Sequence, residues 1–288
     1  MADAPIDLLH RWLERQLPEA SYRWFNGQLA ELLEDPSERA LHILLGLIPR
    51  RLGRDDLALD AEDLAAAAAA RSGWDPAEWS VDETARILVL VEAGRSGMPF
   101  ARLFTDLCRS ADVHEAIALY RGLPLYPEPE RLEPQAAEGV RTNLRAVFEA
   151  VAHRNPYPRE FFDENRWNQM VLKALFIDSR LAPIQGLDER ANPALARILC
   201  DYAHERWAAG RPVSPELWRC VGPFAVGKAL DDLERVMASE DETERKAAAL
   251  ALAASAAPGA KALLGRMPEH AGAIERGTLT WRSLETRE

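Results

Sequence analysis

The segments Leu230–Met237 (LDDLERVM) and Asp241–Leu252 (DETERKAAALAL) predict two helices that are joined by a short polar turn. Asp241 can cap the second helix, and Arg245 follows four positions later. The alanines that come next are small enough to let a neighbouring helix approach closely. We therefore expect an antiparallel helix pair in this part of the chain.

Helical periodicity extends to the N-terminal end of the sequence. Apolar residues recur at Ile6, Leu9, Leu13 and Leu17, and no comparable alternating run suggests a sheet. Capping residues followed three positions later by Glu predict further helix starts. These pairs are Asp35/Glu38, Ser80/Glu83, Asp112/Glu115 and Asp241/Glu244. We expect an all-α protein of roughly fourteen short helices joined by short loops.

The pair at 230–252 resembles a HEAT repeat, in which an Asp at the turn and a following Arg precede a helix rich in small residues. A period of about 40 to 47 residues divides the chain into about six or seven such pairs. The fold prediction is therefore a right-handed α-solenoid of HEAT/armadillo-like helix pairs. We expect residues 1–288 to form a single helical-repeat domain.

A proline-rich stretch, residues 123–134 (LPLYPEPERLEP), interrupts the helical pattern. Four prolines in this stretch predict a loop between an N-terminal half, 1–122, and a C-terminal half, 135–273. A linker between two half-domains is the alternative. We expect the tail at 274–288 to be poorly ordered unless Trp281 docks on the domain.

Composition excludes several classes of protein. The net charge is -11, and no Lys/Arg run is longer than two residues, so the sequence predicts no nucleic-acid partner. The three cysteines show no CxxC spacing, which predicts neither a disulfide framework nor a structural zinc site. No signal peptide or membrane-spanning stretch is recognisable, so we expect a cytoplasmic protein that is not an integral membrane protein.

Residues 155–224 concentrate aromatic, amide and charged side chains. Asn168 shares an apolar helical face with Val171 and Leu175, so it should point inward. An inward amide either ties down a neighbouring loop or lines a ligand pocket. Lys173 lies on another face of the same helix.

Asp201, His204 and Glu205 can meet on one face of a second helix, as metal ligands do. A bundle metal site would need a matching set on a facing helix, and none is recognisable, so we predict no metal and no cofactor. Nucleophile and phosphate-loop motifs are missing as well, so no catalytic residue is assigned. The candidates for binding a ligand or partner are Trp167, Asn168, Lys173, Tyr202, His204, Arg206 and Trp218.

Eight segments of the sequence carry a family resemblance. They are IPRRLG (48–53), GWDPAEWS (73–80), ARILVL (85–90), NPYP (155–158), WNQMVLKALF (167–176), GLDERAN (186–192), DYAHERWAAGR (201–211) and PELWR (215–219). Together they resemble the EboA family of metabolite traffic proteins, and the resemblance extends from about residue 35 to 266. The resemblance implies a helical-repeat protein without transferable catalytic residues. It also implies a bacterial gene cluster that encodes a membrane prenyltransferase of the UbiA type, a TatD-like hydrolase and sugar-phosphate-type enzymes.

The missing catalytic motifs favour a non-enzymatic scaffold or carrier, and the resemblance implies that it takes part in the biosynthesis or traffic of a secondary metabolite, or its precursor, to the cell envelope. Its partners would be the proteins of the same gene cluster or an apolar metabolite. The alternative is an enzyme acting on a prenylated or aromatic metabolite with an acid/base set of Asp201, His204 and Lys173. A HEAT-like DNA glycosylase would need a positive groove, which the acidic composition disfavours.

Overall fold

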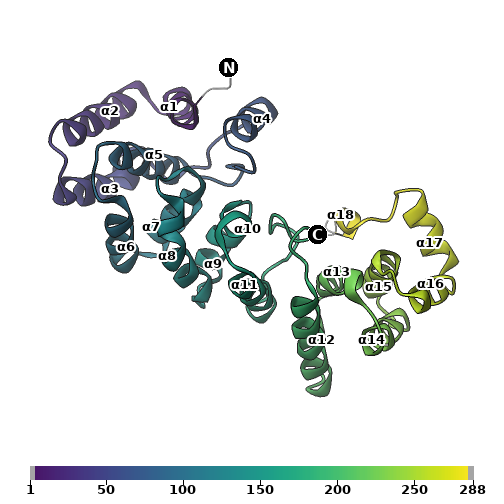
Figure 1. Cartoon of the computed structure of the whole chain (residues 1–288). Coiled ribbons are helices and arrows are strands. Elements are labelled where there is room, and N and C mark those ends of the chain that lie inside the picture. The colour runs from purple at the N-terminus through teal and green to yellow at the C-terminus, as the bar shows by residue number, and fades with distance from the viewer. Residues whose placement is uncertain (1–3, 285–288) are drawn as a thin grey trace. The chain divides into compact units, whose positions relative to one another are not determined.

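Helices make up 70% of the structure, a computed structural model that describes residues 4–284 (Figure 1). No β-strand lies in these residues, so the all-α prediction is confirmed. The described chain holds eighteen α-helices and three short 3-10 helices, more than the fourteen that we expected.

Two compact units divide the chain, Met1–Asp163 and Glu164–Glu288. Charge is divided unequally between them. The first unit has 28 acidic and 18 basic residues, a net charge of -10, whereas the second has 18 acidic and 17 basic residues, a net charge of -1.

Ten α-helices lie in the described part of the first unit, residues 4–163. They are α1 Pro5–Gln16, α2 Glu19–Glu34, α3 Glu38–Leu52, α4 Ala61–Ala70, α5 Val81–Arg95, α6 Phe100–Ser110, α7 Val113–Arg121, α8 Pro129–Arg141, α9 Arg145–Ala152 and α10 Tyr157–Phe161. The 3-10 helix η1 covers Leu123–Leu125.

Helix α5 is at the centre of this unit and contacts α1, α3 and α7 (Figure 1). Most of its residues are apolar and buried, including the run Ile87–Leu90. A helix that is hydrophobic on all sides has to be enclosed by its neighbours. Its start is the predicted one, because Ser80 and Glu83 form a reciprocal capping box.

Two local predictions in the first unit are wrong. Ser37, not Asp35, caps α3, since the Ser37 hydroxyl accepts a hydrogen bond from the Ala40 amide. The stretch 123–134 is not a plain loop, because α8 begins at Pro129 and contains Pro134. A proline in the first turn costs nothing, and packing of α8 against α6 and α9 offsets the hydrogen bond lost at Pro134.

The second unit contains the remaining helices. They are α11 Glu164–Phe176, α12 Pro193–Ala208, η2 Pro215–Leu217, α13 Trp218–Val221, η3 Gly222–Phe224, α14 Lys228–Met237, α15 Glu242–Ala254, α16 Pro258–Leu264, α17 Pro268–Glu275 and α18 Trp281–Leu284. Of the tail predicted to be poorly ordered, residues 285–288 lie outside the described part, and α18 falls within the rest.

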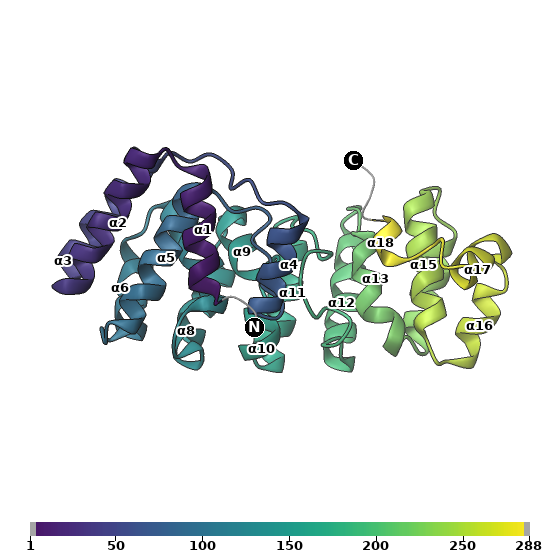
Figure 2. The same ribbon diagram turned by 90° about the horizontal axis from the view of Figure 1, so that it is seen from above.

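Helix α15 is surrounded by α13, α14, α16 and α17 (Figures 1 and 2). The predicted pair of α14 and α15 is confirmed, and Arg245 secures its turn by donating to the Ser239 and Glu240 carbonyls at 2.6 and 2.9 Å. Small residues permit the close packing. A Cβ atom at Gly222 would lie 2.7 Å from the Ala251 backbone, so only glycine fits there.

Candidate functional site

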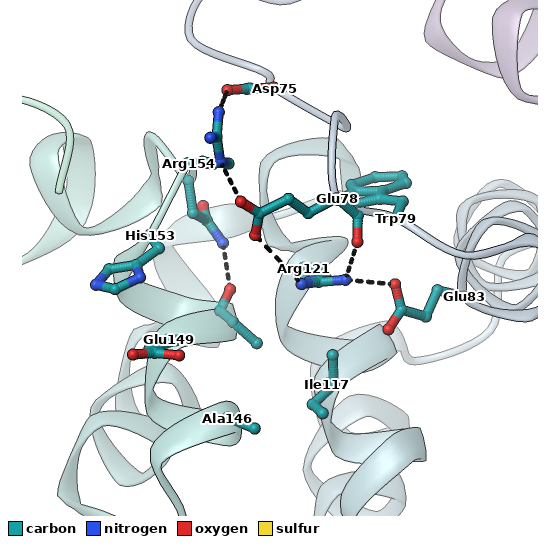
Figure 3. Close-up of a pocket in the computed structure, with 12 residues that line it drawn as sticks. Asp75, Glu78, Trp79, Glu83, Ile117, Arg121, Ala146, Glu149, His153 and Arg154 are labelled. Atoms are coloured by element: carbon teal, nitrogen blue, oxygen red, sulfur yellow. Dashed lines mark hydrogen bonds and ion pairs between the residues drawn. The ribbon is translucent and has the colours of Figure 1, made fainter. Parts of the chain in front are cut away.

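A pocket of about 150 Å³ lies inside the first unit (Figure 3). Its walls come from the loop before α5, the first turn of α5, the C-terminal turns of α7, one face of α9 and the turn after α9. The lining residues are Asp75, Glu78, Trp79, Glu83, Ile117, Arg121, Ala146, Glu149, Ala150, His153, Arg154 and Asn155.

A chain of ion pairs with alternating charge follows one side of the pocket (Figure 3). Arg154 donates to Asp75 at 2.8 Å and to Glu78 at 2.9 Å. Arg121 donates to Glu83 at 2.6 Å, and its other terminal nitrogen lies 3.9 Å from the Glu78 carboxylate. Three carboxylates therefore share two guanidinium groups.

Local structure fixes Glu83 and Arg121 within this chain. One Glu83 oxygen accepts from the Ser80 amide at 3.1 Å, as part of the capping box that starts α5, and the same oxygen accepts from Arg121. Arg121 also donates to the Glu78 main-chain carbonyl at 2.6 Å, which holds the loop before α5 against α7. Helix capping and side-chain pairing thus position the same carboxylate.

The turn after α9 holds Arg154 in a left-handed backbone conformation, with φ of 51°. Asn155 fixes this turn with a side chain that is only 3% exposed. It donates to the Tyr120 and Ala150 carbonyls at 3.0 and 3.1 Å and accepts from the Tyr157 amide at 3.0 Å. Non-glycine residues with positive φ are uncommon and concentrate at functional sites.

The walls of the pocket outside the ion-pair chain are partly apolar and partly polar. Ile117 and Ala146 contribute apolar surface from α7 and α9. Figure 3 shows His153 and Glu149 at the opposite end of the pocket from Glu83. Burial alone would lower the pKa of Arg154, but its hydrogen bonds and charge interactions with Asp75 and Glu78 raise it, so the guanidinium stays charged.

Helix α11 carries three of the predicted binding residues, Trp167, Asn168 and Lys173, and the first two are buried in contacts with the rest of the second unit. Trp167 is fully buried, and the Arg190 guanidinium lies 4.7 Å from its ring centroid. Asn168 points inward as predicted, and its amide exchanges hydrogen bonds with Asn192 at 2.8 and 3.3 Å. Because Asn192 caps α12, Asn168 ties down a neighbouring loop, one of the two alternatives that the sequence left open. Lys173 is half-buried on the same helix.

Tyr202 and Arg206 lie together on α12. The Tyr202 hydroxyl donates to the Leu175 carbonyl at 3.1 Å, and Arg206 lies 6.0 Å from the Tyr202 ring centroid. Phe176 packs edge-on against Tyr202 with centroids 5.0 Å apart, although its side chain is 61% exposed. Phe176 and Arg206 thus lie beside the buried ring of Tyr202, and Phe176 is the exposed member of the group.

His204 and Trp218 are brought together through Trp207. The Trp207 ring lies 5.8 Å from His204 and stacks on Trp218 at 5.9 Å, and Arg235 lies 4.2 Å from it. The His204 ring pairs with Asp232 of α14 at 2.7 Å, whereas Asp201 is exposed. Sequence reasoning missed Asp232 as the partner because it lies 28 positions away.

Sequence reasoning also missed the pocket. The Ser80/Glu83 capping box and the family-like segments GWDPAEWS and NPYP were local signals, but nothing in the sequence connected them, because Arg121 and Arg154 are far from Glu78 along the chain. Ion pairs of this kind have no sequence pattern, since the packing of helices decides which charged residues meet.

Within residues 4–284, no helix is both long and apolar enough to cross a membrane. The same residues contain no cluster of three or more His, Cys, Asp or Glu side chains suited to a metal ion. Cys108, Cys200 and Cys220 form no disulfide bond within the described residues. Burial, followed by the Asp232 and Asp201 charges, raises the pKa of the Cys200 thiol to about 11, so it remains protonated at neutral pH.

The fold and the pocket define an all-helical protein with a charged pocket enclosed by its first unit. The family model described as "Metabolite traffic protein EboA" matches residues 5–222, a range that includes every residue of the pocket. The chain belongs to the EboA family, which confirms the resemblance seen in its sequence. Neither curated proteins nor solved structures gave a match to the chain.

Proposed function

We propose that the chain is a non-enzymatic carrier protein in metabolite traffic, and that it binds a small polar molecule in the pocket of its first unit. One observation supports this site above the others. Asp75, Glu78 and Trp79 belong to GWDPAEWS and Asn155 to NPYP, two of the segments that resemble the family, and both segments meet at the pocket.

The size and lining of the pocket suit a small ligand. A cavity of 150 Å³ is large enough for a molecule about the size of benzene. Charged groups held in fixed positions beside apolar surface are typical of sites that orient a small molecule. The capping box at Ser80 and the hydrogen bonds of Asn155 pre-organise these groups before any ligand arrives.

The wider role follows from the family description. We propose that the cargo is a secondary metabolite or its precursor on its way to the cell envelope, and that the partners are proteins of the same bacterial gene cluster, among them a membrane prenyltransferase and a TatD-like hydrolase. The right-handed HEAT-like solenoid is part of the same proposal, and the helix pair of α14 and α15 supports it. The single repeat domain over residues 1–288 stays a prediction. A cytoplasmic location stays a prediction.

A scaffold function is the second candidate. The surface formed by Phe176 and Arg206, both of which lie beside the buried Tyr202, favours it, because aromatic and arginine side chains are common anchors of protein interfaces. Pull-down with the products of neighbouring genes tests this role, and an Arg206→Ala variant that keeps every partner would count against this surface.

The carrier proposal is tested by closing the pocket. Ala146 lines the pocket from an exposed position on α9, so Ala146→Trp should fill it without disturbing the core. Ala68→Trp, at an exposed position of α4, is the matched control. We expect ligand-observed NMR against a library of small polar metabolites to detect compounds that bind wild type and Ala68→Trp but not Ala146→Trp. If no compound shows this pattern, the pocket is not a binding site.

A further inference from the structure

We propose that the ligand of the pocket in the first unit carries a positive charge, as a small organic cation such as a primary amine does. This inference rests on the proposed function, because it assigns a chemical class to the ligand of the same site. Three features of the site support it: the charge balance of the ion-pair chain, the burial of Glu83 at one end of that chain, and the residues of the remaining walls.

The ion-pair chain lacks one positive charge. Asp75, Glu78 and Glu83 carry three negative charges, and Arg121 and Arg154 supply two positive ones. Each guanidinium is shared between two carboxylates, so neither neutralises its partners fully. A ligand with one positive charge would bring the chain to neutrality.

The burial of Glu83 strengthens this imbalance at one end of the chain. The Glu83 side chain is 12% exposed and the Arg121 side chain is 24% exposed, whereas Asp75, Arg154 and Glu78 are more open to solvent, at 32%, 42% and 58%. A charge in the position of Glu83 is screened less by solvent than a charge on an open surface, so it acts more strongly on a ligand inside the pocket. The first unit as a whole adds to this field with its net charge of -10.

The remaining walls fit the same ligand class. Glu149 adds a further carboxylate at the other end of the pocket, where Arg145 pairs with it at 2.7 Å. Ile117 supplies apolar surface for the rest of the molecule, beside Trp79, whose buried ring packs against Trp74. An anion of the same size would add negative charge to a site that already has an excess of it.

Three probes of similar size and different charge test the inference. Benzylamine is a cation at neutral pH, benzyl alcohol is neutral, and benzoate is an anion. Saturation-transfer NMR titrations of the full chain at pH 7 and low salt give the dissociation constant of each probe. We expect benzylamine to bind about tenfold more tightly than benzyl alcohol, with benzoate weakest, and the preference to shrink as salt is added.

Single variants then test whether the preference for benzylamine depends on the carboxylates of the pocket. Glu78→Gln keeps the shape of the side chain but removes the central carboxylate, so it should weaken benzylamine binding several-fold and leave benzyl alcohol unaffected. Glu138→Gln is the matched control, since Glu138 forms an exposed ion pair with Arg141 on α8, outside the pocket. Thermal unfolding shows whether each variant is folded.

The possible outcomes separate this inference from the carrier proposal. If benzoate or benzyl alcohol binds as tightly as benzylamine, and Ala146→Trp abolishes that binding, the pocket binds ligands but the charge assignment is wrong. If Glu78→Gln has no effect on a benzylamine preference, the carboxylate chain is not its source, and the inference also fails. If none of the probes binds and the metabolite library gives no pocket-dependent compound, both proposals fail.

Discussion

The buried ion pair of Asp82 and Arg86 in α5 should be the most sensitive charged contact of the first unit. Both side chains are almost fully enclosed, at 4% and 3% exposure, and Arg86 donates to Asp82 at 2.9 Å. Arg86 also donates to the Leu45 carbonyl of α3 at 3.4 Å and lies 3.6 Å from Glu115 of α7. One guanidinium thus connects three helices.

Replacing Arg86 with Met keeps a long apolar side chain but removes the charge. Asp82 would then retain the Ser80 hydroxyl, at 2.6 Å, but its negative charge would be buried without a cation. Removing one partner of a buried ion pair costs about 3–5 kcal/mol of unfolding free energy. The double variant Asp82→Asn with Arg86→Met leaves no unpaired charge of this pair, so it should be about 2 kcal/mol more stable than Arg86→Met alone.

Urea unfolding measures these differences, with far-UV circular dichroism for the whole chain. Because the chain has two compact units, hydrogen exchange of the α5 amides should be followed in parallel as a probe of the first unit. Arg141→Met removes an exposed ion pair of α8 and serves as the control, with an expected cost of about 0.5 kcal/mol or less. A cost for Arg86→Met below about 1 kcal/mol, or a double variant less stable than it, would refute this reasoning.

Three further predictions concern other contacts. Burial alone would raise the pKa of Asp63, but hydrogen bonds from Arg15, the Asp60 amide and Trp12 outweigh burial and lower this pKa. The stability that the Asp63 carboxylate contributes is therefore present at neutral pH and lost on acidification. The free energy of unfolding should fall more steeply below about pH 4 in wild type than in Asp63→Asn. Arg154 has positive φ, so Arg154→Gly should be about 1 kcal/mol more stable than Arg154→Ala, by urea unfolding. Gly222→Ala should cost about 1–3 kcal/mol because its Cβ meets the backbone of α15, whereas Gly46→Ala, in open space on α3, should stabilise by about 0.5–1 kcal/mol in thermal unfolding.

Each of these predictions has a contrary result. Parallel pH profiles for wild type and Asp63→Asn would show that the carboxylate does not lose its contribution in acid. Equal stability of the two Arg154 variants would mean that the turn relaxes when the arginine is removed. Equal effects at Gly222 and Gly46 would show that α15 can move away from the added methyl group.

Much of the fold could be predicted because it depends on neighbours in sequence. The capping box at Ser80 and Glu83, the inward position of Asn168 and the pair of α14 and α15 are all set within a few turns of helix. Hydrophobic periodicity and the hydrogen bonds of the first helical turn act over short distances. Family membership was also recognisable from the sequence, because it depends on short segments of residues.

The sequence by itself therefore determined the all-α class and several helix starts, because these depend on interactions between residues at most a few positions apart. It also determined the family, which short segments of residues identify. Only the tertiary structure decided that α8 continues through Pro134, that His204 pairs with Asp232, and that Arg121 and Arg154 meet Glu78 at a pocket. The physical reason is that ion pairs act between charges that are close in space, and helix packing brings together residues tens of positions apart in the chain.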